Sequence, residues 1–130
     1  MTIEERAALA AKRKAEGACN CCQAVAVALA DQTGLSEETL MAACSGFAVG
    51  MGNMEGTCGS LVAAVMTAGL RLGGKGTLRL SRRISENFSG RCGAVRCRDL
   101  KGLTTGKELC SCADCVKNAV LAYGEVMGLE

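Results

Sequence analysis

The chemistry open to this sequence depends on its cysteines. Ten of the 130 residues are Cys, whereas His is absent. Without His the chain cannot build a Cys₂His₂ zinc site, a Rieske centre or a Cys–His catalytic dyad. A site made of sulfur ligands alone remains, and four thiolates suit an iron–sulfur cluster or a structural zinc ion.

The cysteines fall into separated groups along the chain. These groups are Cys19, Cys21 and Cys22; Cys58; Cys92 and Cys97; and Cys110, Cys112 and Cys115. Cys44 lies in an apolar run, where a cysteine usually packs as a small hydrophobic side chain. Only Cys112 and Cys115 have the Cys-x-x-Cys spacing of a zinc knuckle, so spacing alone favours neither zinc nor a ferredoxin-like cluster.

Residues 46–66 change from a glycine-studded loop into an apolar helix, and Cys58 lies at the junction. Thr57 is expected to cap this helix, which would put Cys58 near the first helical position. The free N–H groups and the helix dipole favour a thiolate there. The loop backbone could also approach a cluster closely and donate to its sulfurs. The glycines expected to support the site are Gly50, Gly52, Gly56 and Gly59.

Helices must position these cysteines, because no convincing alternating strand pattern occurs. The sequence predicts an all-α, single-domain bundle of about five helices over residues 1–130, with a glycine-rich loop before the central helix. A further short helix is expected near Arg98. Asn20 is a natural N-cap for a helix that would run to Gly34, so Cys21 would lie near a helix start, as would Cys115.

Composition limits the other functions. The chain is 49% hydrophobic and contains no Pro, which favours a packed helical core without disulfides. The N-terminus lacks the apolar region of a signal peptide, and no stretch of 18 apolar residues occurs. We therefore expect a cytoplasmic protein without a membrane partner, in which the thiols stay reduced.

Charge is uneven along the chain, since most of the basic surplus lies in residues 71–101. This segment has only Phe88 for base stacking and no recognised nucleic-acid motif. A solvated face, or one that offsets an anionic site, is therefore the preferred interpretation. No nucleic-acid partner is expected.

Four short blocks resemble a family of redox-active proteins. The family is named for an ordered pattern of a Cys, a Gly-Cys-Ala-x-x-Gly core and two further Cys. The matching blocks here are Asn20–Val25, Gly50–Ser60, Cys97–Leu100 and Cys115–Ala119. Ser60 and Ala63 stand where the family tends to have Ala and Gly, which are changes between small residues.

The resemblance implies that four cysteines converge on one metal or redox site. They are Cys21, Cys58, Cys97 and Cys115. The additional redox thiols would be Cys19, Cys22, Cys92, Cys110 and Cys112. The family is similar to a domain of split-Soret-type cytochromes that carries an iron–sulfur centre beside haem, and the absence of His removes the haem part here.

Three functional interpretations stay open. The first is a redox or electron-transfer protein with a Cys-ligated iron–sulfur cluster, which would need an electron-transfer partner protein. The second is a metal-free thiol–disulfide protein, and the third is a structural zinc-binding interaction module. Whether the protein is an enzyme stays open as well. We also expect a homodimer, because Ala- and Met-rich helices can leave an apolar face exposed.

Overall fold

Helices account for all the regular structure in the computed structural model, which describes residues 1–130. The longer helices are α1 (Ile3–Ala15), α2 (Cys21–Ala28), α5 (Gly59–Arg71), α6 (Thr77–Cys92) and α8 (Cys112–Met127). The shorter ones are α3 (Ala30–Thr33), α4 (Glu37–Ala43), α7 (Cys97–Leu100) and the 3₁₀ helix η1 (Ser45–Phe47). The all-α class is confirmed, but the expected number of about five helices is too small, since eight α-helices form.

Local capping explains where several helices begin. Thr2 and Glu5 form a reciprocal capping box on α1, and Asn20 and Gln23 form another on α2. Ser36 caps α4 with its side chain. Such caps satisfy N–H groups that the first turn leaves without partners.

The predicted helix from Cys21 to Gly34 is interrupted at Leu29, which is a correction to the sequence analysis. The backbone of Leu29 has φ −110° and ψ 18°, so α2 ends at Ala28 and α3 begins at Ala30. The Leu29 side chain is fully buried in the core. Leucine favours helices, and residues 21–33 contain neither Gly nor Pro, so the local sequence does not predict this break.

Helix α8 is central to the packing, because it contacts α1, α2, α5 and α6. The core is one cluster of 26 buried residues, most of them small. Gly124 lets α1 and α8 pack closely, since a Cβ there would lie 2.4 Å from Cγ1 of Ile3. Tyr123 is buried in this core, and its hydroxyl donates a hydrogen bond to Gln32 (3.2 Å).

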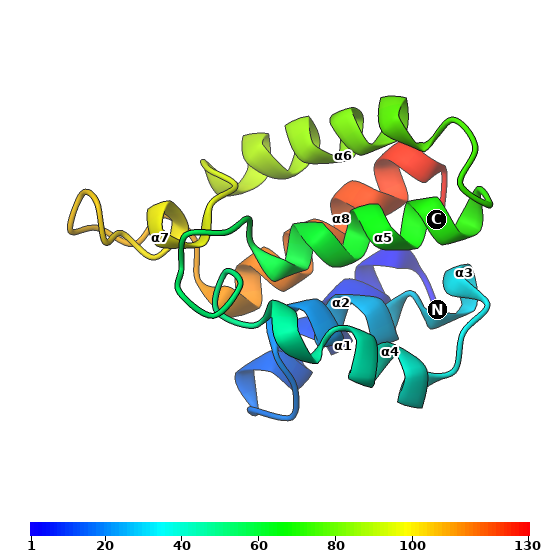
Figure 1. Cartoon of the computed structure of the whole chain (residues 1–130), viewed down its shortest axis with the longest axis horizontal. Helices are drawn as coiled ribbons and strands as arrows, with labels where there is room; N and C mark the ends of the chain where they lie inside the picture. Colours follow the sequence, from blue (N-terminus) through cyan, green and yellow to red (C-terminus); the bar gives the residue numbers. More distant parts are fainter.

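The longer helices run roughly side by side, so that their ends gather at two ends of the molecule (Figure 1). The starts of α2, α5 and α8, the end of α6, and α7 all lie at one end. Both chain termini lie at the opposite end, near α3. Since cysteines occupy those helix starts and the end of α6, we call the first end the sulfur end and the other the terminal end.

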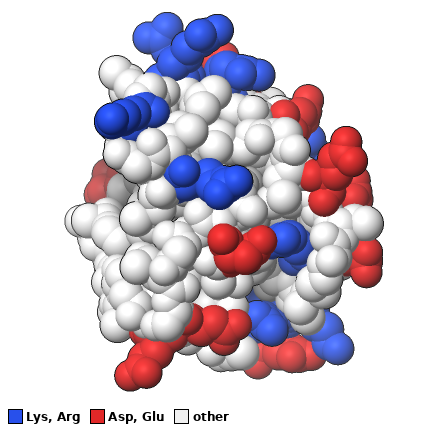
Figure 2. Space-filling model, turned by 90° about the vertical axis from the view of Figure 1, so that its right-hand side faces the viewer, with Lys and Arg blue, Asp and Glu red and all other residues white.

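Charge is unevenly distributed over the terminal end. Figure 2 shows this face with a group of Lys and Arg side chains at the top, whereas acidic side chains lie along the lower and right-hand edges with further basic side chains among them. On α6, Arg79, Arg82 and Arg83 are exposed. None of the helices combines the length and the hydrophobicity needed to cross a bilayer.

Candidate metal and redox site

A pocket of about 270 Å³ at the sulfur end is lined by four cysteines, together with Lys14 and Lys101. The four are Cys21, Cys58, Cys97 and Cys112. We call this space the cysteine pocket. Three of its cysteines belong to the predicted set of four, whereas Cys112 was expected only as an additional thiol.

Each cysteine of the pocket stands where a helix begins. Cys21, Cys97 and Cys112 are the first residues of α2, α7 and α8, and Cys58 is the N-cap of α5. The N-termini of α2, α5 and α8 carry partial positive charge, which favours thiolates near them. The four sulfurs thus come from four helix starts separated by long stretches of chain.

The position of Cys58 differs by one residue from the prediction. Thr57 does not cap α5 but pairs with Arg96 in an isolated antiparallel bridge. Cys58 takes the N-cap position, makes no side-chain capping bond, and donates its N–H to the carbonyl of Val95 (2.8 Å). Because the thiol is not used for capping, it is free to interact with other groups.

Glycines let the loop before α5 fit tightly against the other elements. A Cβ on Gly50 would lie 2.5 Å from Cβ of Cys97, and one on Gly59 would lie 2.9 Å from the carbonyl oxygen of Phe47. The carbonyl of Gly56 accepts a hydrogen bond from the N–H of Cys97 (3.0 Å). These contacts position Cys97 relative to Cys58.

Gly52 contributes through its conformation alone. It has φ +85°, and a Cβ there would meet nothing within 4 Å. Three residues of the same loop also have positive φ although they are not Gly, namely Val49, Met51 and Met54. Such conformations persist only where the surrounding structure enforces them, and they cluster at functional sites.

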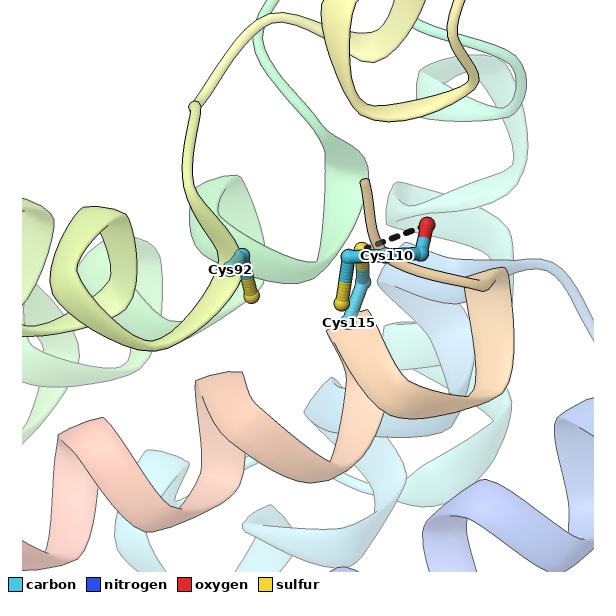
Figure 3. A group of neighbouring side chains, drawn as sticks. All are labelled: Cys92, Cys110 and Cys115. Atoms are coloured by element: carbon cyan, nitrogen blue, oxygen red, sulfur yellow. Dashed lines mark hydrogen bonds between the residues drawn. The ribbon is translucent and has the colours of Figure 1, made fainter. Parts of the chain in front are cut away.

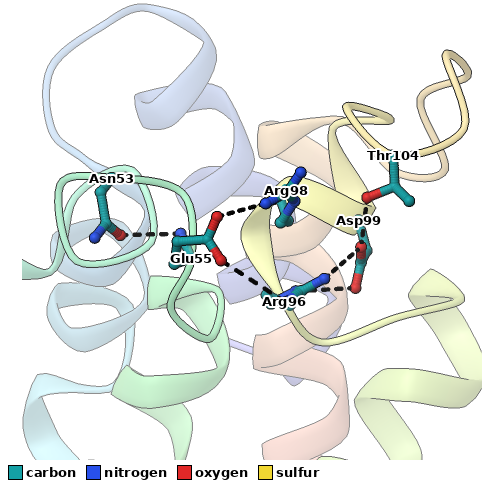
Figure 4. A network of polar contacts seen from close by, with 6 residues as sticks. All are labelled: Asn53, Glu55, Arg96, Arg98, Asp99 and Thr104. Carbon is teal, nitrogen blue, oxygen red and sulfur yellow. Dashed lines mark hydrogen bonds and ion pairs between the residues drawn. The ribbon is translucent and has the colours of Figure 1, made fainter.

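A polar network ties this loop to α7 (Figure 4). The carboxylate of Glu55 accepts a hydrogen bond from Arg98 and pairs with Arg96 at 3.8 Å, while Arg96 also pairs with Asp99 at 3.3 Å. The N–H of Arg98 donates to the carbonyl of Met54 (3.0 Å). Exposed ion pairs contribute little free energy individually, but together these contacts hold α7 against the loop.

The thiols of the pocket differ in acidity. Hydrogen bonding to Cys21, helped by the ammonium group of Lys101, lowers the pKa of Cys112 to about 5. The same contact raises the pKa of Cys21. Hydrogen bonding to Cys115 lowers the pKa of Cys58 to about 6, whereas burial raises the pKa of Cys97. These shifts favour the thiolate form at Cys112 and Cys58 and the thiol form at Cys21 and Cys97.

The surroundings of Cys58 are suited to a sulfur that carries negative charge. Ser60 is fully buried, and its hydroxyl has no hydrogen-bond partner. The Ser60 hydroxyl and backbone N–H are near enough to the sulfur of Cys58 to lower its pKa. Because the lining of the pocket contains no carboxylate or His, the cysteine sulfurs are its main metal ligands, which fits an iron–sulfur cluster or zinc.

A second cysteine group adjoins the pocket. Cys92, Cys110 and Cys115 are buried, and their sulfurs all lie within 4.8 Å of one another (Figure 3). We call them the buried trio. The amide of Asn118 donates to the sulfurs of Cys92 (3.4 Å) and Cys110 (3.8 Å). Hydrogen bonding to Cys115 lowers the pKa of Cys92 to about 7.

Cys115 was expected in the same site as Cys21, Cys58 and Cys97. The structure places it in the buried trio, where it contacts Cys58 but does not line the pocket. No local signal could have revealed the trio, because Cys92 reaches the other two only through the packing of α6 against α8.

The remaining cysteines lie outside both groups. Cys44 is fully buried, as expected for a core residue, and it contacts the equally buried Cys22. Burial raises the pKa of Cys22. Cys19 is half-buried and packs against the edge of the core. These three are less suited to a shared metal site than the pocket and the trio.

Fold and site together define a helical, cysteine-rich protein whose clustered thiols could bind a metal or undergo redox chemistry. A family described as "Putative redox-active protein (C_GCAxxG_C_C)" matches residues 19–126. The match covers most of the chain, so the chain belongs to this family, as the sequence blocks predicted. Neither the curated proteins nor the solved structures gave a match.

Proposed function

We propose that this protein transfers electrons through an iron–sulfur cluster held in the cysteine pocket. The proposed ligands are Cys21, Cys58, Cys97 and Cys112. The observation that carries the proposal is that four cysteines from four separate helix starts line one pocket. Membership of a redox-active family supports the same conclusion.

The chain supplies the features that such a cluster requires. An iron–sulfur cluster provides a redox couple whose potential depends on its net charge, the hydrogen bonds to its sulfurs and its exposure to solvent. Lys14 and Lys101 would offset the negative charge of four thiolates. Gly50 and Gly59 bring backbone to the pocket wall, where a side chain would clash with its neighbours.

The fourth ligand is the point on which geometry and family pattern differ. The pattern assigns Cys115, whereas Cys112 lines the pocket and contacts Cys21. We propose Cys112, because Cys115 lies within the buried trio. Serine variants at these two positions separate the alternatives.

An electron-transfer partner would need a docking surface near the pocket. Val49 lines the pocket, and Val49 and Met51 are 59% and 58% exposed. Exposed apolar side chains beside a redox site could contact such a partner. The homodimer and the cytoplasmic location stay predictions.

The test is anaerobic purification followed by iron, sulfide and zinc analysis and visible absorption. We expect a brown protein with iron and sulfide in equal amounts. Cys97→Ser and Cys112→Ser should each lower the iron content several-fold, whereas Cys19→Ser, outside both groups, should not. Iron loss in Cys115→Ser but not in Cys112→Ser would favour the family pattern, and a colourless protein without iron would contradict the proposal.

A thiol–disulfide function is the second candidate, because Cys21 and Cys112 lie in contact, and their hydrogen bond lowers the pKa of Cys112 and raises that of Cys21. The Cys112 thiolate would attack a disulfide of a partner, and Cys21 would then displace the partner thiol. This forms a Cys21–Cys112 disulfide and reduces the partner disulfide to two thiols. Equilibration with oxidised glutathione and mass spectrometry would detect the Cys21–Cys112 bond in metal-free protein.

A further inference from the structure

The buried trio has the features of a second site, apart from the cysteine pocket. Its sulfurs come from three places: Cys92 ends α6, Cys110 precedes α8, and Cys115 lies in the first turn of α8. All three sulfurs lie within 4.8 Å of one another. Around one zinc ion, with bonds of about 2.3 Å, three thiolates would lie about 4 Å apart. Only a small inward shift would therefore bring the sulfurs to a shared cation.

Backbone contacts hold two members of the trio in place. The N–H of Cys110 donates to the carbonyl of Leu100 (3.3 Å), which ties its segment to α7. The carbonyl of Cys110 accepts hydrogen bonds from Nζ of Lys101 (3.1 Å) and from the thiol of Cys115 (3.8 Å). The trio is thus supported by its own contacts rather than being a chance approach of three flexible side chains.

The environment of Asn118 separates this group from ordinary core packing. Its amide donates to the sulfurs of both Cys92 and Cys110. Cysteines that act only as small hydrophobic residues do not need an amide donor. Hydrogen bonds from a polar side chain to sulfur stabilise thiolate ligands, as the surroundings of known metal ligands do.

The trio is also reachable from the surface. Cys110 and Asn118 line an open cavity of about 480 Å³, whose charged lining includes Asp114 and Lys117. A cation could enter from this side without crossing the cysteine pocket. The same opening would leave room for a water molecule as a fourth ligand.

We propose that Cys92, Cys110 and Cys115 form a second metal site, which binds a thiophilic cation of the Zn²⁺ type through three thiolates. Thiolates select such soft cations, and no His or carboxylate belongs to the group. Asn118 is a positioning residue for two of the sulfurs. Cys115 also contacts Cys58 of the cysteine pocket, so the two sites adjoin, but the proposed cation is held by the three sulfurs of the trio alone.

The first experiment measures Zn²⁺ binding to the full chain, purified anaerobically with its native pocket contents. Cys92→Ser and Cys110→Ser should each lower the affinity for one bound Zn²⁺ ion by at least about a hundredfold. Loss of a ligand should cost more than loss of a supporting residue, which lowers metal affinity about 10–100-fold. Asn118→Ala should lower the affinity for the same Zn²⁺ ion about tenfold. Cys19→Ser is the matched control and should bind as the wild type does. Wild-type affinity in both trio serine variants would overturn the proposal.

A second arm tests whether the two sites are separate. Cys97→Ser removes a cysteine of the pocket and leaves the trio intact, so the trio should still bind Zn²⁺ when pocket iron is lost. Co²⁺ in place of Zn²⁺ should show thiolate-to-metal charge transfer that falls in Cys92→Ser but not in Cys97→Ser. If Cys97→Ser also lost the Zn²⁺ ion bound to the trio, the two sites would not be separate. Absence of pocket iron would count against the proposed function alone.

A measurement on the wild type covers the case in which the trio variants do not fold. Zn²⁺ should slow alkylation of Cys110 by iodoacetamide at least tenfold, as followed by peptide mass spectrometry, because a ligated thiolate is a poor nucleophile. Cys19 should react at the same rate with and without Zn²⁺. Equal alkylation of Cys110 in both conditions would overturn the trio site.

Discussion

The sulfur end and the terminal end are built from the same helices but differ in how those helices finish. At the terminal end, Gly34, Gly76 and Gly128 adopt left-handed conformations, and a Cβ on any of them would meet nothing within 4 Å. At the sulfur end, the loop before α5 packs so tightly that Gly50 and Gly59 admit no side chain without a clash. The glycines that end or begin helices at the terminal end are therefore needed for conformation, whereas the loop before α5 needs glycine for space as well.

Backbone strain follows the same division. All the non-glycine residues with positive φ are Val49, Met51 and Met54, and they belong to the loop beside the cysteine pocket. Each such conformation costs about 1–3 kcal/mol and must be offset by packing elsewhere. The comparison indicates that strained non-glycine backbone is confined to the end that positions the cysteines.

Among the variants that test this difference between the two ends, Cys58→Ser should have the largest effect. The change replaces a soft thiolate by a hard, weakly acidic hydroxyl at nearly the same volume, so a soft metal loses a strong ligand. Iron content should fall at least several-fold, while the helix content measured by circular dichroism stays at the wild-type level. Full iron content together with unchanged thiol reactivity would contradict the role of Cys58.

Gly50→Ala should disturb the sulfur end next most strongly. Its Cβ would lie 2.5 Å from Cβ of Cys97, at a φ of +55° that disfavours Ala. We expect a loss of about 2–4 kcal/mol in the free energy of unfolding, since overpacking adds to the conformational cost. Gly52→Ala is the matched control with positive φ and open space, and it should lose only about 1–2 kcal/mol. Equal losses in urea titrations would show that space around Gly50 is unimportant.

Cys44→Ser should affect stability without affecting the metal. Cys44 is fully buried against Cys22, so a serine hydroxyl would lack an assured hydrogen-bond partner. The free energy of unfolding should fall by about 1–3 kcal/mol. Iron and zinc contents per folded molecule should equal those of the wild type, and a selective loss of either metal would place Cys44 in the site.

The smallest effect is expected at the terminal end, from the Arg6–Asp31 ion pair. Hydrogen bonding to Arg6 lowers the pKa of Asp31 to about 2. A carboxylate with a lowered folded-state pKa adds stability above its unfolded pKa of about 3.9, and this is lost as pH falls towards 2. Since the Asp31 side chain is 56% exposed, the contribution should be about 1 kcal/mol or less.

Asp31→Asn checks this last prediction. The variant should lose the part of the acid dependence that lies between about pH 4 and pH 2, as measured by urea unfolding at several pH values. Its iron content at neutral pH should not change, because α3 lies at the end opposite the cysteines (Figure 1). An Asp31→Asn chain with the wild-type acid profile would show that the pair contributes no stability.

Sequence by itself determined the features that depend on neighbours within a few residues. The cap at Asn20 forms as predicted, and Thr2 and Ser36 cap their helices in the same way, because each side chain accepts a hydrogen bond from the N–H three residues ahead. The short helix near Arg98 also forms, as α7. The ordered cysteine blocks were sufficient to identify the family, and the lack of His was sufficient to exclude imidazole ligands.

Tertiary structure alone decided which sulfurs meet. Cys112 and Cys115 are three residues apart on α8, yet one lines the pocket and the other joins Cys92 and Cys110. That division depends on how α8 lies among α2, α5 and α6, and these contacts join segments far apart in the chain. Local sequence patterns carry no information on the angle at which two helices pack, so they could nominate the cysteines but not assign them to a site.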